Sequence, residues 1–207
     1  MKILMFGDSI TDAHRERDCD GSVFSYGNGY VFNVAGELLS ENPLGYEIIN
    51  RGISGHRITD LYARIKSDVW NFNPDVLSIL IGVNDVWHEI AHKNGVELDR
   101  FEKVYRMLIE DTLKVLPNVK IMILEPFILK GIETESEFDK FLLVKEYAKV
   151  AKKLAKDYNL TFVPLQDKFD DMASRYGVAP FLFDGVHPNI AGAKLIAKEW
   201  LNAFKNI

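Results

Sequence analysis

The sequence predicts an α/β protein in which helices cover both faces of a five-stranded parallel sheet. Five short apolar runs alternate with segments of helical periodicity along the chain. The apolar runs are rich in β-branched or bulky residues and contain little charge, as is typical of strands buried on both faces. The chain has 207 residues, enough for one sizeable core, so we expect a single domain over residues 1–207.

The elements follow one another in a regular order. The predicted strands are, in sequence, Lys2–Phe6, Tyr46–Asn50, Val76–Ile81, Val119–Leu124 and Thr161–Leu165. Apolar residues recur at helical spacing in the intervening stretches, which predicts helices over Gly29–Ser40, Ile58–Trp70, Leu98–Leu116, Glu137–Tyr158 and Asn189–Phe204. Strands separated by helices favour a doubly wound parallel sheet, and Gly177–Asp184, with Gly177 and Pro180, is expected to be a loop.

The composition excludes several classes of function. A formal net charge of −5 gives no basic footprint for nucleic acid or for an anionic membrane surface. The single cysteine, Cys19, excludes an intramolecular disulfide. Apolar runs are too short to span a bilayer, and the N-terminus enters a strand without the pattern of a signal peptide. We therefore expect a cytoplasmic protein.

Polar residues follow the first three predicted strands. Ser9 comes after the first strand through the turn Gly7-Asp8, the segment Gly52–Gly55 follows the second, and Asn84 follows the third. Parallel α/β sheets bind ligands beyond the carboxyl ends of their strands, so these groups should share one rim. The loop before the last helix, which contains Asp184 and His187, can fold over that rim.

These residue types suit nucleophilic acyl transfer. The Ser9 hydroxyl is too weak an acid to attack unaided, and His187 is the candidate base. Asp184 lies three residues earlier, in a loop with Gly185, and could hold the imidazole in one tautomer. The backbone N–H groups of Ser9 and Gly55 and the side-chain amide of Asn84 are candidate donors to an oxyanion.

Four short blocks carry a resemblance to a known family. They resemble, in order and at the expected strand ends, the sequence blocks of the SGNH (GDSL-type) hydrolases: Gly7-Asp8-Ser9-Ile10, Gly52-Ile53-Ser54-Gly55, Gly82-Val83-Asn84-Asp85 and Asp184-Gly185-Val186-His187-Pro188. The resemblance implies a flavodoxin-like, three-layer α/β/α fold with strand order 2-1-3-4-5. It also implies Ser9 as nucleophile, His187 as base, Asp184 as its partner, and an oxyanion hole of Ser9, Gly55 and Asn84, with no metal or other cofactor.

Longer stretches of the sequence are similar to those of the bacterial acetyl-xylan esterases of that family, which remove a small acyl group from a carbohydrate hydroxyl. These stretches are Gly7–Asp12, Gly27–Val31, Asn50–Gly55, Ile81–Trp87 and Glu125–Phe127. The expected partner is thus a small acyl ester, such as an acetylated sugar, with a lipase or thioesterase activity as the alternative. Candidate substrate contacts are Asp8, Tyr30, Trp87, His88, Phe127 and Val186. The aromatic members equally suit a packed interior, and a homo-oligomer is compatible with the sequence.

Two other classes of function remain open at this point. His88-Glu89-Ile90-Ala91-His92 matches the H-E-x-x-H motif of zinc hydrolases, but the longer form of that motif needs a third histidine where Leu98 stands. The chain could also be a carbohydrate-binding protein without turnover, because a fold alone does not prove activity. A serine after a strand can simply cap a helix, although the Asp184 and His187 pair favours catalysis.

Overall fold

The computed structural model describes residues 1–207 and has at its centre a five-stranded sheet of order β2-β1-β3-β4-β5, with every neighbouring pair parallel. The strands are β1 (Lys2–Gly7), β2 (Glu47–Gly52), β3 (Val76–Leu80), β4 (Lys120–Leu124) and β5 (Thr161–Val163). The predicted fold class and strand order are confirmed. The first two strands run one or two residues further than predicted, and the last ends two residues sooner.

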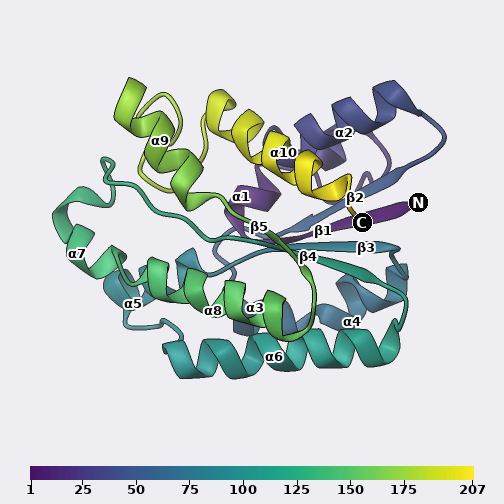
Figure 1. Ribbon diagram of the computed structural model, residues 1–207, viewed down its shortest axis with the longest axis horizontal. Coiled ribbons are helices and arrows are strands. Elements are labelled where there is room, and N and C mark those ends of the chain that lie inside the picture. Colours follow the sequence, from purple (N-terminus) through teal and green to yellow (C-terminus); the bar gives the residue numbers. More distant parts are fainter.

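Helices form a layer on each side of the sheet (Figure 1). One face carries α1 (Ser9–Asp12), α2 (Tyr30–Glu41), α9 (Gln166–Tyr176) and α10 (Ile190–Phe204). The opposite face carries α3 (Ile58–Ala63), α4 (Ile65–Asp68), α5 (Val83–His92), α6 (Leu98–Val115) and α8 (Val144–Asp157), with α7 (Phe138–Phe141) beside α5. Short 3₁₀ turns occupy Val23–Tyr26, Trp70–Phe72 and Glu135–Glu137.

Two helical predictions need correction, and one helix was missed. The segment Ile58–Trp70 is divided into α3, α4 and a 3₁₀ turn, because Arg64 leaves helical geometry at φ −110° and ψ 9°. Glu137–Tyr158 begins as a 3₁₀ turn and α7 before α8 starts at Val144. Helix α9 was not predicted, because the segment is short and mostly polar, although Phe169, Met172, Ala173 and Tyr176 recur at helical spacing.

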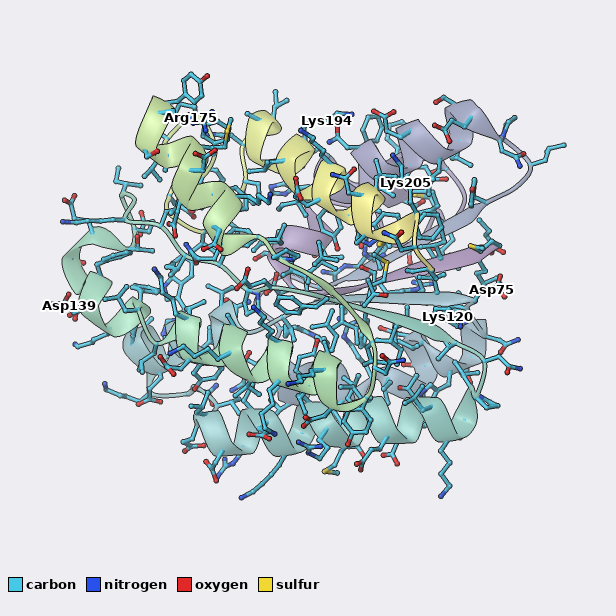
Figure 2. The ribbon with its side chains drawn as sticks, viewed as in Figure 1. Asp75, Lys120, Asp139, Arg175, Lys194 and Lys205 are labelled. Atoms are coloured by element: carbon cyan, nitrogen blue, oxygen red, sulfur yellow. The ribbon has the colours of Figure 1, made fainter.

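The core is formed where the sheet is covered on both faces. Ile3, Leu4, Met5 and Phe6 of β1 are all completely buried, which explains why this strand is continuously apolar. Trp200 of α10 is also fully buried, and its Nε1–H donates to Ser78 Oγ of β3 at 2.9 Å. Truncating such a side chain typically costs about 3–5 kcal/mol. In contrast, charged side chains such as Arg175, Lys194 and Asp139 lie at the periphery (Figure 2).

The strand register brings three chain segments to the same level at the carboxyl end of the sheet. Gly7 pairs with Gly52 on one side and with Leu80 on the other. A Cβ at Gly7 would lie 2.4 Å from Thr11 Oγ1 and 2.5 Å from Leu80 O, so only glycine lets the chain turn here directly into α1. The residues that follow these three strands therefore emerge side by side, as predicted.

Candidate active site

Ser9 and His187 meet above this rim although they lie 178 residues apart in the sequence. Ser9 is the first residue of α1, and Asp8 caps the helix by accepting the Ile10 N–H at 3.0 Å. Ser9 Oγ lies 2.8 Å from His187 Nε2, and His187 Nδ1 lies 2.5 Å from Asp184 Oδ2. Since a carboxylate can only accept, the Nδ1–H donates to Asp184 and Nε2 is left to accept the serine proton.

A tight loop holds the aspartate and the histidine together. Asp184 Oδ1 accepts the N–H groups of Val186 and His187 at 2.8 and 2.7 Å, while Oδ2 serves the His187 ring. Between them, Gly185 adopts φ +105°, and a Cβ there would lie 2.5 Å from Thr134 Oγ1. The sequence Asp-Gly-x-His thus folds into a local turn that needs no distant segment to orient the imidazole.

The charges of these groups reinforce one another. Burial alone would raise the pKa of the Asp184 carboxyl, but hydrogen bonds from the His187 ring and from backbone amides lower it below its ordinary value. Burial disfavours the charged form of His187, yet the hydrogen bond to Asp184 and the charges of Asp184 and Asp8 raise its pKa above the ordinary 6.5. Burial also raises the pKa of Asp8 to about 7. The site therefore stabilises the imidazolium that forms when histidine takes a proton.

Three hydrogen-bond donors surround the serine. The N–H groups of Ser9 and Gly55 donate to no group within the protein, and Gly55 adopts φ +81°, which favours glycine. The Asn84 side chain, at the start of α5, is positioned by an Nδ2–H bond to His56 O at 3.1 Å. All three residues line the cavity that contains Ser9. This arrangement has the form of an oxyanion hole.

The cavity has a volume of about 860 Å³ and is open to solvent. Trp87 and His88, both predicted as substrate contacts, lie in its wall. Eleven lining residues were not predicted as site residues; five of them are polar, namely His14, Asn28, Ser54, His92 and Asn189, and the others include Phe183. Phe183 stacks on the His187 ring at 5.7 Å between centroids, and Trp87 approaches the same ring at 5.9 Å. Phe183 immediately precedes Asp184 in the sequence, which was the only signal that could have indicated it.

The structure does not bring the other predicted contacts to the cavity. Tyr30, Phe127 and Val186 are at most 1% exposed. The Tyr30 hydroxyl pairs with Thr11 Oγ1 at 3.1 Å, and Phe127 stacks on Phe169 at 4.3 Å. Both aromatics therefore belong to the packed interior. Asp8 is likewise buried beneath the serine, where its oxygen caps α1. None of the four can touch a substrate in the cavity.

The H-E-x-x-H segment lies on α5, and no third metal-ligating side chain is grouped with its two histidines. His88 and His92 are neighbours on α5, with ring centroids 5.8 Å apart. Glu89 instead accepts the N–H of Gly95 at 3.2 Å, where the chain leaves the helix. No group of three or more histidine, cysteine, aspartate or glutamate side chains is arranged to hold a metal ion.

None of the helices combines the length and the apolar composition that crossing a membrane requires.

Comparison with known proteins agrees with this site. The chain matches the GDSL-like lipase/acylhydrolase family over residues 5–195. It is 37% identical to an acetylxylan esterase from Geobacillus stearothermophilus, over 97% of this chain and 92% of the relative. A protein assigned as a GDSL-like lipase from Parabacteroides merdae superposes with a TM-score of 0.92 and 38% identity, over 99% of this chain and 95% of that one.

Solved structures of the Geobacillus enzyme extend the comparison. The acetylxylan esterase itself gives a TM-score of 0.86 at 35% identity, over 98% of this chain and 93% of that one. Three further structures of it are catalytic mutants in which a serine, an aspartate or a histidine is replaced by alanine. The replaced aspartate and histidine are three residues apart, the spacing of Asp184 and His187.

Fold and site together define a carboxylic ester hydrolase with a flavodoxin-like sheet. The chain belongs to the GDSL-like lipase/acylhydrolase family. The resemblance found in the sequence blocks is thereby confirmed.

Proposed function

We propose that this protein hydrolyses small acyl esters, with acetyl groups on carbohydrate hydroxyls as the preferred substrate, through a Ser9–His187–Asp184 triad. The observation that carries the proposal is the continuous chain of short contacts, 2.8 Å from Ser9 Oγ to His187 Nε2 and 2.5 Å from His187 Nδ1 to Asp184 Oδ2. This chain links a nucleophile, a base and an orienting carboxylate in the order that acyl transfer requires.

The chemistry proceeds in two halves. Ser9 Oγ attacks the ester carbonyl carbon while His187 Nε2 takes the hydroxyl proton, and the new oxyanion lies among the Ser9 and Gly55 N–H groups and the Asn84 amide. As the C–O bond of the leaving alcohol breaks, His187 returns the proton to that oxygen. Water then attacks the acyl-enzyme with His187 again as base, which releases the acid and restores Ser9.

Three observations support a small acyl group on a sugar. Only five of the seventeen residues that line the cavity are hydrophobic, and polar side chains among the others, such as His14, Asn28 and Asn189, can form hydrogen bonds with sugar hydroxyl groups. Among the apolar members, Trp87 and Phe183 present rings beside His187. The relative that is 37% identical over nearly the whole chain is an acetylxylan esterase.

A substrate panel tests the proposal. We expect kcat/KM to be highest for acetylated xylose and xylo-oligosaccharides, lower for p-nitrophenyl acetate, and to fall steadily for butyrate, octanoate and thioesters. A maximum at long acyl chains or at thioesters would contradict the acetyl preference and favour a lipase or thioesterase. Acetylated sugar that binds without turnover, with equal background rates in the wild type and Ser9→Ala, would indicate a carbohydrate-binding protein.

A further inference from the structure

The carboxylate of Asp12 lies close to the site but has no part in the mechanism above. Asp12 is the last residue of α1 and is only 4% exposed. Its Oδ2 atom accepts two hydrogen bonds from one residue, the Ser54 N–H at 2.9 Å and the Ser54 hydroxyl at 3.1 Å. The exposed Arg17 approaches the same oxygen at 3.3 Å. A buried charge with three donors is well compensated, and two of the three come from the residue before Gly55.

The contact between Asp12 and Ser54 connects the two chain segments that carry the backbone donors of the oxyanion hole. Helix α1 carries Ser9, one backbone donor, at its first position and Asp12 at its last. Gly55, the other backbone donor, belongs to the loop that follows β2. The Gly55 N–H lies in the peptide unit directly after the one that carries the Ser54 N–H, so holding Ser54 at both its N–H and its hydroxyl restricts the direction of the Gly55 N–H. Gly55 itself adopts φ +81° and cannot supply that restraint, since glycine tolerates many backbone conformations.

Other contacts hold this loop at its ends and across its turn, where the His56 N–H donates to Ile53 O at 3.3 Å. At the start, Arg15 Nε donates to Gly52 O at 2.9 Å. At the far end, Asp85 Oδ1 accepts the Ile58 N–H at 3.0 Å, and Asn84 holds His56 O. Asp12 contacts Ser54, the residue immediately before Gly55, through its side chain.

We propose that Asp12 is a positioning residue that sets the Gly55 N–H against the Ser9 N–H, so that both point at one oxyanion. The inference rests on the proposed function, because it concerns the donors of that reaction. It assigns to the final aspartate of the Gly-Asp-Ser-Ile-Thr-Asp segment a task separate from that of Asp8, which caps α1.

Three variants test this role by turnover. Asp12→Ala removes the acceptor, and we expect kcat to fall about 10- to 100-fold, part of the loss that follows removal of a whole oxyanion donor. KM should change less than about threefold, since the bond acts on the transition state. Asp12→Asn retains one oxygen of the same reach and should recover most of the activity. Arg17→Ala, which leaves the Ser54 contacts intact, is the control and should match the wild type.

Two readouts separate positioning from simple structural support. All rates are divided by the fraction of enzyme titrated by an active-site phosphonate, so that misfolded protein does not count. The affinity for an alkyl boronic acid, whose adduct carries a tetrahedral oxyanion, should weaken in parallel with kcat, while the pKa of the acid limb of the pH profile stays unchanged. A lowered Tm with unchanged kcat and boronate affinity would overturn the proposal.

Amide hydrogen exchange tests the contact without any need for activity. In the wild type, the Ser54 N–H should be protected; it should exchange faster in Asp12→Ala and remain protected in Asp12→Asn. If Asp12→Ala does not fold, Asp12→Ser, whose hydroxyl is too short to reach Ser54, replaces it. An unprotected Ser54 amide in the wild type overturns the inference on its own. A wild type that protects Ser54 but hydrolyses no ester contradicts the proposed function and leaves this contact standing.

Discussion

Replacing Asp184 by asparagine tests the orientation of the base with little change in shape. In the structure, Asp184 Oδ1 accepts two backbone N–H groups at 2.8 and 2.7 Å, and Oδ2 accepts from the His187 ring. An asparagine can keep its oxygen on the two amides. Its NH₂ group then faces His187 Nδ1, which must become an acceptor, so that Nε2 carries the proton and can no longer take one from Ser9.

The effect of this substitution on turnover and its effect on stability can be estimated separately from these contacts. We expect kcat of Asp184→Asn to fall about 10⁴-fold, the order found when the triad aspartate of a serine protease becomes an amide. This corresponds to about 5 kcal/mol of lost transition-state stabilisation. The free energy of unfolding should fall by less than about 2 kcal/mol because two of the three hydrogen bonds persist. Asp184→Ala loses all three and should cost about 3 kcal/mol or more.

The assay is hydrolysis of p-nitrophenyl acetate from pH 5 to pH 9, with urea unfolding measured on the same preparations. Asp139→Asn is the matched control, because this exposed carboxyl lies on the outer side of α7, away from the site (Figure 2). It should retain wild-type turnover and stability. If folded Asp184→Asn hydrolyses the ester within tenfold of the wild-type rate, Asp184 does not orient the base and the triad must be reassigned.

Four further predictions follow from the same geometry. Asn84→Ala should lower kcat about 10²- to 10³-fold with a small change in KM, and wild-type turnover would exclude this amide from the oxyanion hole. In the wild type, kcat/KM should rise with pH as His187 loses its proton, with a midpoint above 6.5, because its pKa is raised. Asp8→Asn removes a charge that raises this pKa, so the midpoint should move to lower pH; a move upward would refute the assignment. Gly185→Ala should reduce the free energy of unfolding by about 1–3 kcal/mol in urea, more than Gly177→Ala, whose φ is also positive but whose added Cβ meets nothing.

The sheet could be predicted from the sequence because its strands are buried on both faces. Four consecutive apolar residues in β1, all fully buried, exclude a strand that has one face exposed to solvent. The triad and the oxyanion donors were predicted from their places after strands, since parallel strands carry their carboxyl ends to one rim. Helix α9 was missed because it is short and mostly polar, so that its few apolar residues give only a weak signal although they recur at helical spacing.

The substrate contacts were the weaker part of the prediction. Tyr30 and Phe127 belong to stretches that resemble the acetyl-xylan esterases, but residue type alone does not say whether an aromatic ring faces a cavity or the core. Asp12 was not singled out, because the partner of an acidic residue at the end of a short helix depends on the path of a loop more than forty residues away. Such contacts depend on tertiary structure and leave no local pattern.

The most direct test of the account is to identify the group that carries the acyl intermediate. The wild-type enzyme is mixed with p-nitrophenyl acetate, quenched in acid within its first turnovers, digested and analysed by mass spectrometry. We expect one acetyl group on the peptide that contains Ser9, located on Ser9 by fragmentation, and none in Ser9→Ala. Acetylation at another residue, or an active enzyme in which Ser9 is never acylated, would contradict the central claim that this hydroxyl is the nucleophile.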